Sequence, residues 1–261
     1  MHPHSRGVTA EEALAAPSAE PDETPGSSDR IERLRTERTA TEDVILRRRS
    51  VRAYKKKQVP EFMVRRILEA GRFAPAAGNG QAWRFVVIRD PDIIRGLTET
   101  TRKVCKVFAW LIDYQGRRFS WRLPLARLFI RARANDLHPV PFSAIPLIAE
   151  GKLGVFHGAP TVILILKDVR GVSNPDLDCG IAGQNMVLAA HSMGLGTCWV
   201  SFAKLAFQYS RRWKKRLGVG HPYKFVSSLA VGFPVGEPDG MVARPTPAVD
   251  WFEDGAKRVS L

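Results

Sequence analysis

The stretch Arg47-Arg48-Arg49-Ser50-Val51-Arg52-Ala53-Tyr54 concentrates four arginines and a serine within six residues. Guanidinium groups donate paired hydrogen bonds to phosphate oxygens, and a serine hydroxyl adds a short-range contact. The segment, residues 47–54, is therefore a candidate anion clamp. Taken alone, it is explained at least as well by a solvated basic turn.

A loop of small and amide residues follows the next predicted helix. It comprises Pro75-Ala76-Ala77-Gly78-Asn79-Gly80-Gln81. Small residues let a backbone approach a flat ligand closely, and the amides of Asn79 and Gln81 both donate and accept hydrogen bonds. The edge of a nucleobase or a flavin needs that mixed pattern, whereas an ordinary turn is the simpler explanation of the loop by itself.

A third segment runs from Asp178 to Met186 and on into Gly194-Leu195-Gly196-Thr197-Cys198-Trp199. Its small residues suit close helix packing, and core packing is the simplest role for this helix. The two glycines follow a helix and lack the third glycine of a dinucleotide fingerprint, which excludes a Rossmann site. Cys198 is predicted to pack in the core, because nothing in the sequence places a base beside it.

Strands and helices alternate along the chain. Met63, Val64, Ile67 and Leu68 recur at helical spacing, and a further helix opens at Pro91. The apolar run 159–166 predicts a strand buried on both faces. We predict a long helix with Asp176 as its N-cap and Gly194 just past its end, and further strands at residues 83–88, 197–200 and 224–233. This order predicts a layered α/β or α+β domain.

Two regions depart from that rhythm. Residues 1–28 are rich in Ala, Pro, Glu, Ser and Thr and are predicted to be a disordered acidic tail, which leaves residues 29–261 for the domain. Residues 102–156 mix aromatic residues with many arginines and then become proline-rich. We interpret this segment as an insertion with helical pieces that could act as a lid.

Composition narrows the functional classes. The chain has 261 residues and a net charge of +14, yet no helix-turn-helix, zinc-finger or RNP-like pattern, so we expect no specific nucleic-acid partner. Three cysteines without a CxxC pair argue against a disulfide framework, a metal site or an iron–sulfur cluster and favour the cytoplasm. No apolar run approaches the about eighteen residues of a membrane span. Peripheral membrane contact is a weaker alternative, since Pro124 interrupts the amphipathic segment.

Taken together and in this order, the three segments resemble the nitroreductase family over roughly 200 residues. The resemblance rests on Arg48-Arg49-Ser50-Val51-Arg52-x-Tyr54, Gln58-Val59-Pro60, residues 67–71, residues 74–85 and residues 194–199. It implies an α+β, three-layer α/β/α fold with a mixed central sheet, and an intertwined homodimer that holds FMN between its subunits. Ala82 before Trp83, and Ser201 where glycine is common, depart from the family pattern.

The resemblance also implies the cofactor contacts. Arg48, Arg49 and Ser50 would hold phosphate and ribityl oxygens, Arg52 would reach the pyrimidine end of the ring, and Asn79 would bond the ring edge. Backbone N–H groups near Trp199, Val200 and Ser201 would face N5. The full predicted cofactor-binding set is Arg48, Arg49, Ser50, Arg52, Pro75, Ala76, Ala77, Asn79, Gln81, Thr197, Cys198, Trp199 and Arg244. No side chain is assigned a catalytic role, because the flavin carries the chemistry.

The family implies an oxidoreductase that passes electrons from NAD(P)H through FMN to a small electron-poor acceptor such as a nitroaromatic or a quinone. A dehalogenating or dehydrogenating relative would share the flavin site and differ in the lid. A flavin-binding protein with little turnover, which sequesters FMN, is the alternative from another functional class.

Overall fold

The computed structural model describes residues 38–112, 124, 139–172, 174–236, 247–253 and 256–260. The predicted tail, the middle of the predicted insertion and Arg244 lie outside these residues. The chain divides into two units, residues 1–43 and 44–261. At the junction, helix α2 (Ala40–Arg47) opens with a reciprocal cap, in which the Thr39 hydroxyl oxygen accepts from the Glu42 N–H and the Glu42 carboxylate accepts from the Thr39 N–H.

Four strands form the central sheet in the order β1-β2-β4-β3. These are β1 (Trp83–Ile88), β2 (Thr161–Asp168), β4 (Tyr223–Gly232) and β3 (Gly196–Val200), and all their pairings are antiparallel. Residues 161–166 of β2 are buried, as the apolar run predicts. We expected a mixed sheet; among the described residues, parallel pairing is limited to the bridge between Ser50 and Thr197.

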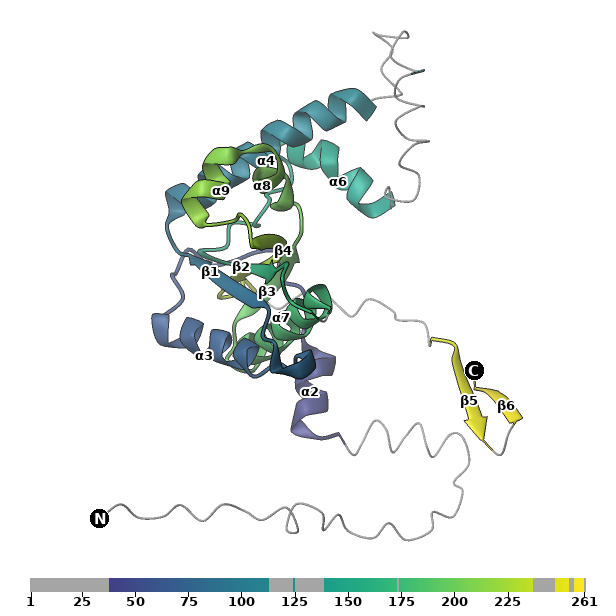
Figure 1. Ribbon diagram of the computed structural model, residues 1–261. Helices are drawn as coiled ribbons and strands as arrows, with labels where there is room; N and C mark the ends of the chain where they lie inside the picture. The colour runs from purple at the N-terminus through teal and green to yellow at the C-terminus, as the bar shows by residue number, and fades with distance from the viewer. Residues whose placement is uncertain are drawn as a thin grey trace. The chain divides into compact units, whose positions relative to one another are not determined.

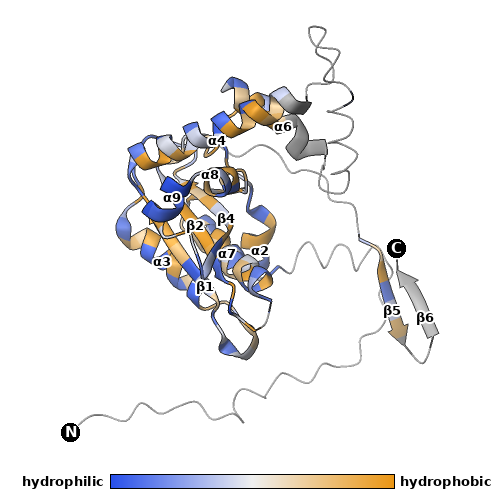
Figure 2. Cartoon of the chain, turned by 45° about the horizontal axis from the view of Figure 1, so that its top comes forward, coloured by the Kyte–Doolittle hydropathy of each residue, from blue (hydrophilic) through white to orange (hydrophobic). Residues whose placement is uncertain are grey.

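Helices cover both faces of the sheet (Figure 1). One face carries α3 (Glu61–Arg72) and α7 (Pro175–Ser192), which pack over Ile163 and Ile165. The other face carries α4 (Pro91–Ile112), α6 (Pro139–Glu150), α8 (Lys204–Tyr209) and α9 (Arg211–Leu217). There the core includes Val162, Leu164 and Leu166, because side chains alternate along a strand. Figure 2 shows the apolar strands between the two helical layers. The predicted three-layer α/β/α fold is confirmed.

The start of α7 corrects the sequence prediction. We predicted Asp176 as the N-cap, but the cap is Asn174, whose side-chain oxygen accepts from the Leu177 N–H at 3.2 Å. Pro175 fills the first helical position, where a missing N–H costs nothing, and Asp176 lies within the first turn. The end agrees with the prediction, since Gly194 adopts the left-handed conformation just past the helix.

Helix α4 continues without a break past Arg102, where we placed the start of the insertion. Cys105 within α4 is fully buried, and so are Ile148 at the end of α6 and Phe156 after it. Both ends of the segment 102–156 therefore contribute to the core. Further along the chain, β5 (Val249–Glu253) and β6 (Ala256–Ser260) form an antiparallel hairpin that the sequence analysis did not predict. Among the described residues, no helix is long and apolar enough to span a membrane.

Candidate functional site

The arginine segment lies along the outer edge of the sheet. The Val51 N–H donates to the Thr197 carbonyl at 2.9 Å, next to the parallel bridge between Ser50 and Thr197. Further on, the Lys55 N–H donates to the Phe233 carbonyl at 2.8 Å. Residues 50–55 are thus fixed in an extended form along β3 and the end of β4. The structure brings the first and third sequence segments together.

Two glycines permit this close approach. A Cβ atom at Gly196 would lie 2.7–2.8 Å from three side-chain atoms of Val51, and one at Gly232 would lie 2.8 Å from the Tyr54 ring. The Tyr54 hydroxyl donates to the Val51 carbonyl at 2.6 Å, and burial raises the pKa of this phenol. Tyr54 therefore stays a neutral donor that ties its side chain to the backbone of the segment at Val51.

The arginines of the segment have different surroundings. Arg49 donates from Nη1 to the carbonyl of Leu46, in the last turn of α2, and to its neighbour Arg48 at 2.8 Å. These bonds use two of its five donors and leave three on Nε and Nη2. Burial raises the pKa of the Cys198 thiol, and the nearby Arg52 and Arg48 oppose that rise. The charges of Arg48 and Arg52 therefore act on Cys198, which is buried in the core as predicted.

Two histidines from distant parts of the chain join this cluster. Burial lowers the pKa of His157, and the positive charge of Arg52 lowers it further. Burial also lowers the pKa of His191, at the end of α7, and Arg48 and Arg49 act in the same direction. Both imidazoles are consequently neutral at pH 7. Neither histidine can be assigned to the site from the sequence, because nothing in the local sequence shows that they lie near the arginines.

The loop at residues 75–81 is held in an unusual backbone conformation. Gly78, Asn79 and Gln81 all have positive φ angles, of 59°, 54° and 43°. The Gln81 amide donates to the Asn79 side-chain oxygen at 2.8 Å, so that the two exposed side chains are fixed relative to each other. The Asn79 NH2 group and the Gln81 carbonyl oxygen remain able to bond a ligand. Non-glycine residues in this region are rare and gather at functional sites.

This loop and the arginine segment lie at opposite ends of the sheet. The loop leads into Trp83, which pairs with Lys167 of β2. At the other end, Ser50 pairs with Thr197 of β3. Across the sheet, Thr197 pairs with Val231 of β4, and Val231 pairs with Thr161 of β2. Six residues of β2 separate the two levels, which at about 3.3 Å per residue amounts to about 20 Å. Within one chain, Asn79 and Gln81 are therefore not brought together with Arg48 and Arg52.

Comparison with known proteins identifies the relatives of this chain. The model of the nitroreductase family matches residues 45–233. The chain belongs to the nitroreductase family. This confirms the predicted family and, with it, the general class of flavin-dependent oxidoreductase.

Individual relatives are distant. A protein of Archaeoglobus fulgidus, whose name assigns it provisionally to the NADH dehydrogenases and NAD(P)H nitroreductases, is 25% identical over 196 residues, 75% of this chain and 86% of its own length. A 5,6-dimethylbenzimidazole synthase of Rhodospirillum rubrum is 26% identical over 187 residues, 72% of this chain and 78% of its own length. The crystal structure of a nitroreductase with bound FMN from Desulfitobacterium hafniense superposes with a TM-score of 0.57 at 24% identity, covering 79% of this chain and 95% of that one.

In this nitroreductase-family chain, the peptide groups of β3 point in alternating directions. The Thr197 carbonyl points away from β4 to meet Val51, so the peptide groups of Trp199 point out of the same edge. The Trp199 ring lies against Gly183 of α7, and the residue as a whole is 37% exposed. The backbone position expected to face N5 thus lies on the open edge of the sheet, next to the arginine segment.

Arg244, the last predicted contact, lies outside the described residues. Among the residues that are described, no three or more His, Cys, Asp or Glu side chains are grouped to hold a metal ion. The site that the structure assembles in one chain is thus made of the arginine segment, Thr197, Cys198 and Trp199. The loop of Pro75, Ala76, Ala77, Asn79 and Gln81 forms a second, separate part.

Proposed function

We propose that the protein is an FMN-dependent oxidoreductase whose flavin lies between two copies of the chain, and that NAD(P)H supplies the electrons. The observation that carries this proposal is the separation of the arginine segment and the 75–81 loop to opposite ends of one sheet. If both motifs bind one flavin, the arginine segment must come from one copy and the 75–81 loop from its partner.

The residues present fit FMN. A terminal phosphate carries up to two negative charges, and Arg48, Ser50 and the free donors of Arg49 offer charge-assisted bonds to it. The neutral state of His157 and His191 adds no repulsion against the arginines. At the other end of the ligand, the Asn79 and Gln81 amides supply the paired donor and acceptor that a pyrimidine edge needs. The absence of a Cβ at Gly78 lets the backbone approach a flat ring.

The flavin, when bound, supplies the hydride chemistry: it takes a hydride from the nicotinamide and gives electrons to the acceptor. The chain's own residues position it. Arg52 would hold the pyrimidine end of the ring, and its positive charge would favour the reduced form. The Trp199 N–H, on the open edge of β3, would donate to a ring nitrogen. Cys198 takes no part as a nucleophile, because burial raises the pKa of its thiol.

Helix α7 supports the two-copy arrangement. It carries apolar residues around its whole circumference, as helices buried on all sides do. In the single chain, however, a stripe remains uncovered: Leu177 is 57% exposed, Gly180 and Gln184 are exposed, and Ile181 is half-buried. A second copy placed on this stripe would bury it, and Gly180 would permit close helix contact. A large apolar interface is what an obligate homodimer requires.

The acceptor that we propose is a small electron-poor aromatic molecule, a nitroaromatic or a quinone. The test is to purify the protein, identify any flavin that denaturation releases, and follow the flavin absorbance in stopped flow without oxygen. We expect FMN rather than FAD, and rapid bleaching by NADH or NADPH followed by recovery on adding a nitroaromatic. A colourless protein that takes up no FMN would refute the proposal. A yellow protein that neither nicotinamide bleaches would favour sequestration of FMN.

A further inference from the structure

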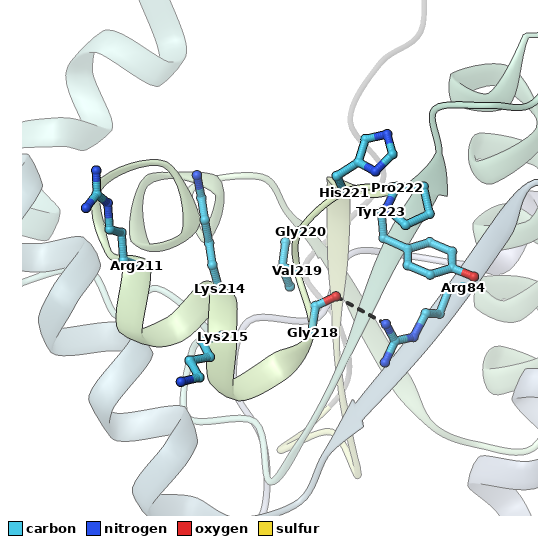
Figure 3. Close-up of a pocket in the computed structure, with 10 residues that line it drawn as sticks. All are labelled: Arg84, Arg211, Lys214, Lys215, Gly218, Val219, Gly220, His221, Pro222 and Tyr223. Carbon is cyan, nitrogen blue, oxygen red and sulfur yellow. Dashed lines mark hydrogen bonds between the residues drawn. The ribbon is translucent and has the colours of Figure 1, made fainter.

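A second basic site is lined by residues other than those proposed to bind flavin. A hollow of about 550 Å³ opens between α9, the start of β1 and the turn that leads into β4. Its lining includes Arg84, Arg211, Lys214, Lys215 and His221 (Figure 3). Arg211 and Lys214 extend side by side from α9, His221 lies on the turn opposite them, and Arg84 reaches toward Gly218 from β1. None of the predicted flavin contacts lines this pocket.

The positive charge of the pocket is not neutralised within the described part of the chain. Its lining has no Asp or Glu, and the ion pairs found among the described residues leave Arg84, Arg211, Lys214 and Lys215 unpaired. The nearby carboxylate is Asp168, at the end of β2, which pairs with Arg170 at 2.6 Å. That ion pair holds the pKa of Asp168 at about 2, and the Asp168 carboxylate is therefore already paired with Arg170 rather than with a cation of the pocket.

Arg84 is fixed in the wall of the pocket. Its Nη1 donates to the Gly218 carbonyl at 3.1 Å, and its guanidinium lies 5.0 Å from the centre of the Tyr223 ring. Gly218 has a φ of +64°, and a Cβ there would lie 3.0 Å from both terminal nitrogens of Arg84. This bond uses one of the five N–H donors of Arg84, and the other four are held in a fixed orientation with it. A ligand that bonds them loses little side-chain entropy.

Stabilisation of the helix end explains only part of this cluster. Lys214 and Lys215 lie in the last turn of α9, where cations complement the negative end of the helix. Arg211 lies in the first turn, where a cation is unfavourable, and Arg84 comes from another element. Cations brought together from separate elements repel one another. A bound anion would relieve that repulsion.

We propose that this pocket binds a phosphorylated organic ligand of about nucleotide size, with at least two phosphate groups held by Arg84, Arg211 and Lys214. The volume falls within the range of about 300–1,000 Å³ that is typical of small-molecule sites. Val219 and Pro222 provide an apolar floor for the organic part of the ligand. The site is a hollow bounded by three elements rather than a stripe along the surface, which favours a small ligand over a nucleic-acid strand.

The test is calorimetric titration of the purified full-length protein, with whatever flavin it carries, with ADP, pyrophosphate, adenosine and a single-stranded oligonucleotide. We expect ADP and pyrophosphate to bind and adenosine not to bind. Arg211→Gln/Lys214→Gln should weaken ADP binding at least about tenfold, since each substitution removes a hydrogen bond between a cation and a phosphate. Arg212→Gln/Arg216→Gln is the matched control: it removes the same charge from the same helix, but those arginines stack on Trp213 outside the pocket. The control should keep nearly the parent affinity.

Four results would overturn the proposal: no heat with ADP or pyrophosphate, equal losses in both double variants, adenosine binding as well as ADP, or binding of the oligonucleotide alone. An Arg48→Ala variant separates this site from the flavin clamp. If that variant, rather than the pocket variant, abolishes ADP binding, the ligand binds at the arginine segment and the pocket proposal is wrong. Because the readout is heat and not turnover, failure of the proposed flavin function would leave this test intact.

Discussion

Arg48 and Arg52 belong to the same arginine segment and their charges both act on Cys198, yet they should act differently on a bound flavin. Arg48 is half-buried and is proposed to hold the phosphate, whereas Arg52 is exposed and is proposed to reach the ring. We expect Arg48→Ala to lower FMN affinity by roughly 1.5–3 kcal/mol, about ten- to a hundredfold, as loss of a charge-assisted bond does. Arg52→Ala should spare more of the affinity and lower the reduction potential. Equal affinity losses without any change of potential would contradict these assignments.

The two histidines beside the arginines predict a pH dependence. In the folded chain the pKa of His157 is lowered, so the unfolded chain binds a proton more readily. The free energy of unfolding should therefore fall as pH drops below the ordinary histidine value of 6.5 and continue to fall until the folded-state pKa is reached. His157→Gln should make the decline of melting temperature between pH 7 and 5 shallower. Adding His191→Gln should flatten it further, and an unchanged slope in the double variant would refute this cause.

At the scale of elements, the approach of the arginine segment to β3 depends on Gly196. An added methyl group would collide with Val51, so Gly196→Ala should push the segment away from Thr197. We expect a loss of roughly 1–3 kcal/mol in the free energy of unfolding, as overpacking costs, together with weaker FMN binding. Gly220→Ala is the control, because open space surrounds that position. Chemical denaturation and flavin titration measure both effects; parent-like values for Gly196→Ala would contradict the account.

The sequence predicts elements better than their placement. The apolar run 159–166 and the helical spacing of Val64 and Ile67 are local patterns that show which residues are buried. The strand and the helix that they predict are present. The N-cap of α7 was misplaced because Asn174 and Asp176 are both good caps, and the choice depends on Pro175 filling the first position. Strand order is not local, so only the structure places the 75–81 loop and the arginine segment at opposite ends of the sheet. The neutral histidines could not be predicted for the same reason.

For the whole molecule, the uncovered stripe on α7 predicts dimerisation through that helix. Gly180→Arg would add a long charged side chain where the single chain leaves open space, so it should disturb the partner and not the fold of the chain itself. We expect a monomer mass by light scattering and a marked loss of FMN. Val107→Arg, at an exposed position on the opposite helical layer, should stay dimeric and yellow. Dimers of Gly180→Arg with parent flavin content would exclude α7 from the interface.

The central claim, that one flavin site is built from two chains, is tested most directly by subunit complementation. An Arg48→Ala chain and an Asn79→Ala/Gln81→Ala chain carry different affinity tags, are co-expressed, and their mixed dimers are isolated through both tags. If the two motifs act in trans, half of the sites in the mixed dimer are intact and half lack both motifs. Flavin titration should then show half of the sites binding FMN with the parent affinity. If no site in the mixed dimer binds FMN more tightly than the two variant homodimers do, the motifs do not meet across the interface and the account is wrong.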